Sequence, residues 1–229
     1  MPASPASPAV VVARALLVAA LVVLLALGTG AGRAWDAERM LAAAQRQGPR
    51  ALAGVRALQP LLASLLELDD EVRLVPINEF FNRRIVFTDD ELVWGVADHW
   101  ASPLELLEKG RGDCEDYAIA KYFSLIATGV PVAKLRLVYV RAQVGGPGGV
   151  VQAHMVLAYY PAPSAEPLIL DNLIGEVRPA SRRSDLTPVF SFNGEGLWQG
   201  AGAVSAGDPT ARLSRWREAL AKARAEGFQ

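Results

Sequence analysis

The sequence predicts an α+β fold in which N-terminal helices pack on an antiparallel sheet. Apolar residues recur at helical spacing before Gly129 and at alternating positions after it. Glycine and proline separate these segments, and the chain shows neither an internal repeat nor a second domain. The 229 residues, 52% of them apolar, suffice for one globular domain with a complete core.

The first 34 residues have the pattern of a signal peptide. Arg14 precedes an apolar run over residues 15–27, and small residues follow up to Ala34. This run matches the apolar region of a signal peptide and is shorter than the roughly 20 residues that span a bilayer. We therefore expect residues 1–34 to direct export and to be cleaved near Ala31 or Ala34. An uncleaved membrane anchor is the alternative, because residues 10–12 extend the apolar run.

Two long helical segments open the remaining chain. Residues 36–68 predict two helices, because Gly48 and the proline after it interrupt the apolar pattern. A third helix is expected over residues 70–84, although Pro76 lies near its middle.

Capping signals mark the next helices. Thr88 and Ser102 each begin a capping-box sequence, and the second has proline at the first helical position and Gly110 at its end. Residues 114–127 form the clearest helical pattern, with one apolar face and Gly129 as the terminating residue.

Strands follow these helices. Residues 134–143 and 151–160 alternate in polarity, and a glycine-rich stretch between them predicts a hairpin. Shorter strands are expected over residues 167–173 and 188–192. A final amphipathic helix begins near Pro209.

Charge and cysteine content narrow the possible functions. The net charge is −1, and the chain after residue 34 carries 21 basic and 24 acidic residues, so nothing favours a nucleic-acid partner. Cys114 is the single cysteine, which excludes an intrachain disulfide. A lone thiol in an exported protein indicates either a reactive group or a small buried apolar residue.

Three residues stand where catalytic groups are expected. Cys114 opens a helix directly after Gly112 and Asp113. The helix start should lower the thiol pKa, and the Cys114 N–H can stabilise an oxyanion. His154 lies on a strand, and Asp171 ends another, where its carboxylate could hold the imidazole through Nδ1–H. Taken singly, this histidine could be structural and this aspartate a turn residue.

Acidic residues crowd the same helix start. Asp113, Glu115 and Asp116 place three carboxylates around Cys114. A hard cation such as calcium, which prefers oxygen ligands, would relieve their repulsion. The alternative is that Asp113 only caps the helix and its neighbours are solvated.

The segment GDCEDYAIAKY at residues 112–122 resembles the signature of the bacterial transglutaminase-like cysteine proteinases, the LapG-type periplasmic proteases. The similarity covers roughly residues 75–200, and His99 departs from it where an aromatic residue is expected. Further similar segments lie at residues 78–82, 94–95, 100–103, 153–159, 170–172 and 191–193.

This resemblance implies a papain-like or transglutaminase-like fold for residues 35–229 and a catalytic triad. The triad would consist of Cys114, His154 and Asp171. It also implies calcium dependence, with metal ligands among the acids beside the nucleophile (Asp113, Glu115 and Asp116).

The resemblance further implies a location, a substrate and a partner. The expected location is the periplasm. The expected substrate is a large surface adhesin, cleaved near its N-terminus beside small residues such as an Ala-Ala pair, with biofilm detachment as the result. The expected partner is an inner-membrane receptor that senses cyclic di-GMP and sequesters the protease.

Other functions remain open at this point. A transglutaminase or acyltransferase would share the triad and differ in the acyl acceptor. A zinc site formed by Cys114, His154 and Asp171 would lack the close ligand pairs typical of zinc. A non-catalytic binding module with the same fold is the third possibility.

Overall fold

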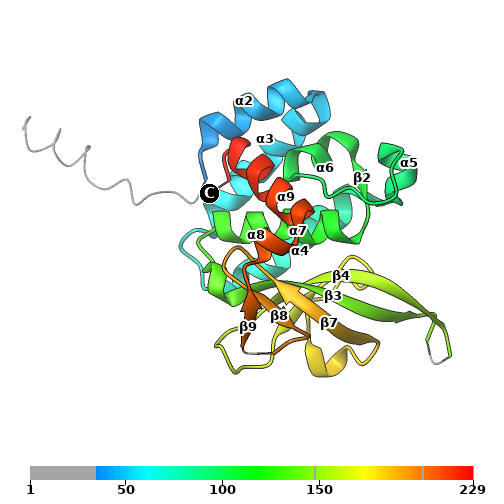
Figure 1. Ribbon diagram of the computed structural model, residues 1–229. Coiled ribbons are helices and arrows are strands. Elements are labelled where there is room, and N and C mark those ends of the chain that lie inside the picture. The colour runs from blue at the N-terminus through cyan, green and yellow to red at the C-terminus, as the bar shows by residue number, and fades with distance from the viewer. Residues whose placement is uncertain (1–34, 147, 203, 229) are drawn as a thin grey trace, which may run out of the picture. The chain divides into compact units, whose positions relative to one another are not determined.

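The computed structural model describes residues 35–146, 148–202 and 204–228, so the predicted signal peptide lies outside the described residues. Most helices precede the strands of the main sheet, and the helices lie on one side of that sheet (Figure 1), which confirms the predicted α+β fold. Among the described residues, no helix is both long and apolar enough to cross a membrane.

The first three helices have nearly the predicted boundaries. Gly48 separates the first two with a φ of 148°, and Pro49 takes the first position of the second. That φ strains any residue with a Cβ atom, which explains the glycine there. Pro76 lies inside the third helix without ending it. These helices are α2 (Ala37–Gln47), α3 (Pro49–Leu65) and α4 (Asp70–Arg84).

Short elements connect α4 to the central helix. The capping box at Ser102 is present, because Ser102 and Glu105 each accept the other's backbone N–H, at 3.2 and 2.9 Å. The capping box predicted at Thr88 is wrong, since that helix begins after Asp89 and no side chain caps it. Gly110 adopts the left-handed conformation and ends the helix that begins after Ser102, as predicted. The elements are β1 (Val86–Phe87), α5 (Asp90–Trp94), α6 (Pro103–Lys109) and β2 (Arg111–Gly112), and β1 pairs with β2 in parallel.

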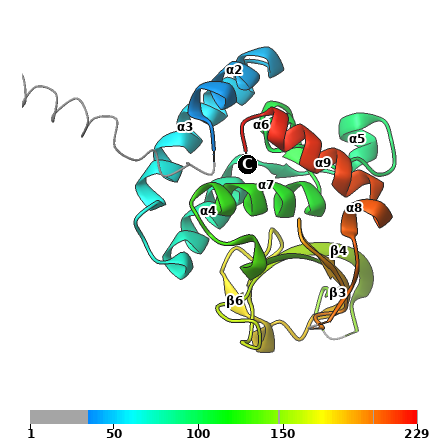
Figure 2. The same ribbon diagram turned by 60° about the vertical axis from the view of Figure 1, so that its left-hand side comes forward.

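Helix α7 (Cys114–Ala127) lies between the other helices and the sheet. The sequence predicted one apolar face, but every residue from Asp116 to Ala127 is buried. The reason is position: α7 packs on α4 and α6 on one side and on strands β3 and β4 on the other (Figure 2). Its first residue, Cys114, is therefore held by a rigid and buried element.

The main sheet is antiparallel throughout, with strand order β6-β5-β4-β3-β7-β8-β9. All predicted strands are present. Strands β6, β8 and β9 were not predicted, because they are too short to show an alternating pattern. The strands are β3 (Leu135–Val144), β4 (Val150–Tyr159), β5 (Leu168–Leu170), β6 (Arg178–Pro179), β7 (Leu186–Phe192), β8 (Leu197–Gln199) and β9 (Ser205–Gly207). There are two 3₁₀ segments: η1 (Val132–Lys134) precedes β3, and η2 (Ala180–Arg182) follows β6.

Both faces of the sheet are apolar. Met155 and Leu157 belong to the main core shared with the helices. Val156 and Ala158, which alternate with them along β4, belong to a second cluster on the other face. Neither face of this part of β4 is therefore left to solvent.

The C-terminal helix is divided in two. The single helix predicted from Pro209 is interrupted at Leu213, which gives α8 (Pro209–Arg212) and α9 (Ser214–Ala225). Trp216 of α9 is fully buried, and its indole N–H donates to the Asn193 carbonyl at 3.0 Å. This contact fastens α9 to the turn between β7 and β8.

Candidate active site

Cys114 is the first residue of α7, and Asp113 is its N-cap. The chain reaches this point through Gly112, where a Cβ atom would lie 2.4 Å from Asp116 Oδ2 and 2.6 Å from the Leu106 side chain. Only glycine fits that approach. Cys114 is half-buried at this fixed helix start.

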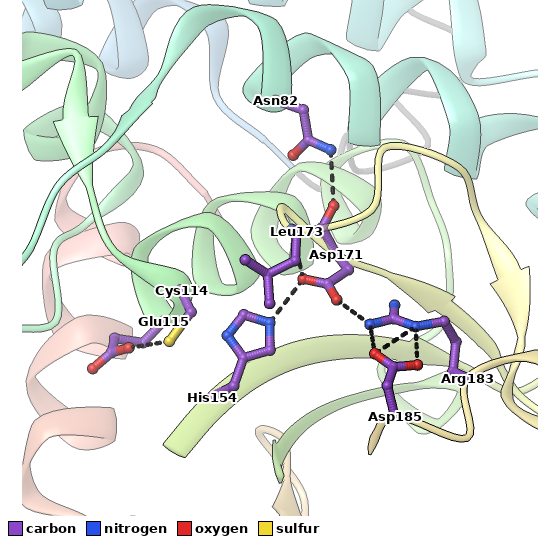
Figure 3. A network of polar contacts seen from close by, with 8 residues as sticks. All are labelled: Asn82, Cys114, Glu115, His154, Asp171, Leu173, Arg183 and Asp185. Atoms are coloured by element: carbon purple, nitrogen blue, oxygen red, sulfur yellow. Dashed lines mark hydrogen bonds and ion pairs between the residues drawn. The ribbon is translucent and has the colours of Figure 1, made fainter. Parts of the chain in front are cut away.

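His154 and Asp171 are brought together by adjacent strands. His154 lies on β4, Asp171 directly follows β5, and the two strands pair at Leu157 and Leu170. His154 Nε2 is 2.8 Å from Asp171 Oδ1, and both side chains are buried. The expected contact through Nδ1 is therefore wrong: Asp171 binds Nε2, and Nδ1 points toward the side of Cys114 (Figure 3).

The Asp171 carboxylate is held by further donors. The Leu173 N–H donates to Oδ1 at 3.1 Å, and Arg183 Nη2 donates to Oδ2 at 2.6 Å. Burial opposes ionisation of Asp171, but the hydrogen bonds from His154, Leu173 and Arg183 outweigh it and hold the carboxyl pKa at about 2. Asp171 is thus a permanent anion beside the imidazole.

Arg183 was not predicted from the sequence. Its side chain is 1% exposed, and it binds Asp185 as well as Asp171, with Nη2 2.8 Å from Asp185 Oδ2. Asn82 of α4 adds a hydrogen bond to the Asp171 carbonyl at 2.8 Å. Asn82 lies in the similar segment 78–82, but the resemblance gave it no role, and Arg183 lies in no recognised motif. Both act through contacts between segments that are distant in sequence.

A second group of acids lies beside the thiol. One oxygen from each of Asp90, Asp113 and Glu115 falls within 4.8 Å of the others. Asp90, at the start of α5, was missed because its sequence position suggested only a helix cap. Asp116 lies outside this group: it is fully buried, and its Oδ1 accepts the Ala101 N–H at 2.7 Å.

The electrostatics of this acidic group fit a bound cation. Burial, followed by the charges of Glu115, Asp116 and Asp90, raises the pKa of Asp113 to about 10. Among the described residues, Asp90 Oδ1 and Asp113 Oδ1 are buried and accept no hydrogen bond, and the same holds for Asp116 Oδ2 outside the group. Clustered carboxylate oxygens without donors are the ligands that Ca²⁺ prefers. The zinc alternative has no such support, since this candidate group contains neither Cys114 nor His154.

The same acids act on the nucleophile. The Cys114 thiol donates to Glu115 Oε2 at 2.8 Å. Burial, then the charge of Glu115 and this hydrogen bond, raise the thiol pKa above its usual range. The expected lowering by the helix start is thus outweighed, first by burial of the thiol and then by the negative charge beside it. Neutralising Glu115 would favour the thiolate.

Comparison with known proteins identifies the class. The fold and the helix-borne cysteine define a transglutaminase-like cysteine protease. A family model described as bacterial transglutaminase-like cysteine proteinase BTLCP matches residues 63–185. The chain belongs to this family of cysteine proteinases.

Solved structures of Legionella pneumophila LapG are similar over most of their length. One is 37% identical, with a TM-score of 0.69 over 82% of this chain and 97% of that chain. EGTA-treated LapG is 38% identical, with a TM-score of 0.71 over the same shares of the two chains. Calcium-bound LapG is 37% identical, with a TM-score of 0.68 over 82% of this chain and 98% of that chain. Comparison with curated proteins gave no significant match.

Proposed function

We propose that this cysteine protease is a calcium-dependent periplasmic endopeptidase with a Cys114–His154–Asp171 triad. The observation that carries the proposal is the buried pair of His154 and Asp171, which leaves Nδ1 on the side of the helix-borne thiol. This order of nucleophile, base and orienting group is what acyl transfer through a thioester requires.

The residues divide the reaction between them. His154 Nδ1 takes the thiol proton, and Cys114 Sγ attacks the carbonyl carbon of the scissile bond. The Cys114 N–H at the start of α7 can donate to the developing oxyanion. His154 then protonates the leaving amine, and water hydrolyses the thioester with His154 as base. Asp171 keeps the imidazole oriented and stabilises its charged form.

Calcium would be held by Asp90, Asp113 and Glu115. When bound, it would neutralise the acids whose charge opposes thiolate formation and order the segment that leads into α7. The similarity to a calcium-bound LapG supports this assignment.

The proposed substrate is the N-terminal region of a large surface adhesin, cut beside small residues such as an Ala-Ala pair and so released from the cell. The proposed regulator is an inner-membrane receptor for cyclic di-GMP that sequesters the enzyme. Both proposals extend the family resemblance of residues 112–122, and membership of the cysteine proteinase family is what supports them.

The test is incubation of purified N-terminal adhesin fragments with the enzyme, with and without EGTA, beside Cys114→Ala. We expect a discrete cut that EGTA and the substitution both prevent. Added primary amine separates hydrolysis from acyl transfer: incorporation of the amine instead of water would favour a transglutaminase or acyltransferase. Absence of any cut by the native enzyme would reject the proposed function.

A further inference from the structure

The outer half of strand β4 has an open edge. Strands β3 and β4 pair along their whole length without a register shift, from Leu135↔Tyr159 to Val144↔Val150. On the other side, β5 pairs only with residues 157–159. Among the described residues, no strand pairs with residues 150–156 on that side. Residues 150–153 are exposed, and their hairpin projects from the sheet (Figure 1).

The backbone groups at this edge can be assigned by parity. Tyr160 donates its N–H to the Lys134 carbonyl, on the β3 side. Because successive residues of an antiparallel strand direct their N–H and C=O to opposite sides, even-numbered residues of β4 face β3. Odd-numbered residues face the other way. Val151, Ala153 and Met155 therefore present their backbone groups to the open edge.

This edge leads to the nucleophile. The Met155 N–H interacts with the Cys114 thiol. At about 3.4 Å per residue, Ala153 and Val151 lie roughly 7 and 14 Å further along the strand. A peptide paired with these two residues would bring its scissile bond to the thiol.

The edge carries none of the features that usually prevent strand pairing. Natural edge strands are protected by lysine, proline or a bulge. Residues 150–153 read Val-Val-Gln-Ala, without charge or proline, and the register shows no bulge. An extended peptide can add to such an edge through main-chain hydrogen bonds.

We propose that the polypeptide substrate binds as an added strand on the open edge of β4, with hydrogen bonds to Val151 and Ala153. The inference rests on the proposed endopeptidase function and defines its substrate class. The cleaved segment must be extended and free of stable structure for several residues on at least one side of the scissile bond. Folded segments with the same residues should resist cleavage.

Proline at Val151 tests this pairing. Val151→Pro removes an N–H that faces the open edge and leaves the bonds to β3 in place, and edge strands tolerate such a proline. Val151→Ala is the matched control, because it shortens the side chain and keeps the N–H. The substrate is a 12-residue peptide that spans the adhesin bond cut by the native enzyme.

We expect Val151→Pro to lower kcat/KM for this peptide by roughly tenfold, as loss of a backbone hydrogen bond does. Val151→Ala should stay within about twofold of the native enzyme. The rate of Cys114 alkylation by iodoacetamide should be equal in all three proteins. Equal kcat/KM for the two variants would overturn the proposal. If the native enzyme cuts no adhesin fragment, the proposed function fails first and this inference falls with it.

Amide exchange measured by NMR provides a second test that does not depend on a proline variant. In full-length Cys114→Ala saturated with the same peptide, exchange at Val151 and Ala153 should slow at least tenfold. Gln152 is the internal control, since its N–H already faces β3 and should not change. Unchanged exchange at Val151 and Ala153 would refute the proposal. Exchange at Val151 and Ala153 could instead slow as the protein concentration rises in the absence of peptide. That result would assign the edge to a second copy of the chain and would also refute the proposal.

Discussion

At the residue scale, the site combines one anion held ionised and one group of acids that repel each other. Asp171 is fixed by donors on several sides, and burial protects those contacts from water. The acids around Cys114 have the opposite character, because they lie close together with few donors. The triad is therefore preorganised, whereas the environment of the thiol depends on charge neutralisation.

Asp171→Asn should lower kcat by roughly 10²- to 10⁴-fold, because an amide no longer stabilises the charged imidazole. His154→Ala should lower it at least as far. Peptide cleavage rates measured with folded variants test this. A variant of either kind with native kcat would contradict the assigned roles.

Arg183→Met should destabilise the fold by about 3–5 kcal/mol, since it leaves a buried carboxylate without its cation. Asp185→Asn is the control: Asp185 is one-third exposed and binds Arg183 but not Asp171, so its loss should cost about 1 kcal/mol or less. Urea unfolding of both variants gives the comparison. Equal destabilisation by both would refute a special role for the pair with Asp171.

The pKa of Asp171 predicts a dependence of stability on pH. A folded pKa of about 2, below the ordinary 3.8, stabilises the protein above pH 4, and this contribution is lost as pH falls toward 2. It is worth about 2 kcal/mol. The difference in unfolding free energy between native protein and Asp171→Asn should therefore shrink between pH 5 and pH 2. A constant difference over that range would count against the lowered pKa.

At the scale of elements, strand pairing and helix ends place the site. Helix α7 was predicted from the sequence, as were strands β3 and β4, because their signals are local. The helix has apolar residues at helical spacing before Gly129, and the strands have alternating ones. The sequence did not predict the role of Asp90 or the contact of Arg183 with Asp171. Both arise where α5 and the segment after η2 fold back on distant parts of the chain. The choice of Nε2 over Nδ1 likewise depends on the relative position of β4 and β5.

The acidic group joins the start of α5 to the start of α7, so calcium should stabilise both elements. We expect calcium to raise the melting temperature of the native protein, and magnesium to do so poorly because it demands tighter octahedral geometry. Asp90→Asn, Asp113→Ala and Glu115→Ala should each reduce the shift. Glu91→Ala, beside the group but outside it, is the control.

Asp116→Asn provides a further comparison within the same helix turn. Its carboxylate accepts the Ala101 N–H and lies outside the acidic group, so a calcium-induced shift should remain. Loss of the shift in Asp116→Asn with retention in Asp90→Asn would reverse our assignment of the ligands.

At the scale of the whole molecule, the sequence predicted one domain with helices followed by strands, and the structure has that order. Short strands and the interruption of the last helix at Leu213 escaped prediction, because segments of two or three residues carry no periodic signal. The proposed export of the chain is tested separately. Mass spectrometry of protein released by osmotic shock should show a mature N-terminus near Trp35, whereas full-length chain found only in membranes would indicate an uncleaved anchor.

The central claim is that Cys114 attacks the substrate and carries the acyl intermediate. Its most direct test is acid quenching of the enzyme during cleavage of an adhesin fragment, followed by intact and peptide mass spectrometry. We predict a thioester between Cys114 and the N-terminal product, present with calcium and absent after Cys114→Ala. Cleavage by the Cys114→Ala protein at a rate close to native would contradict the claim.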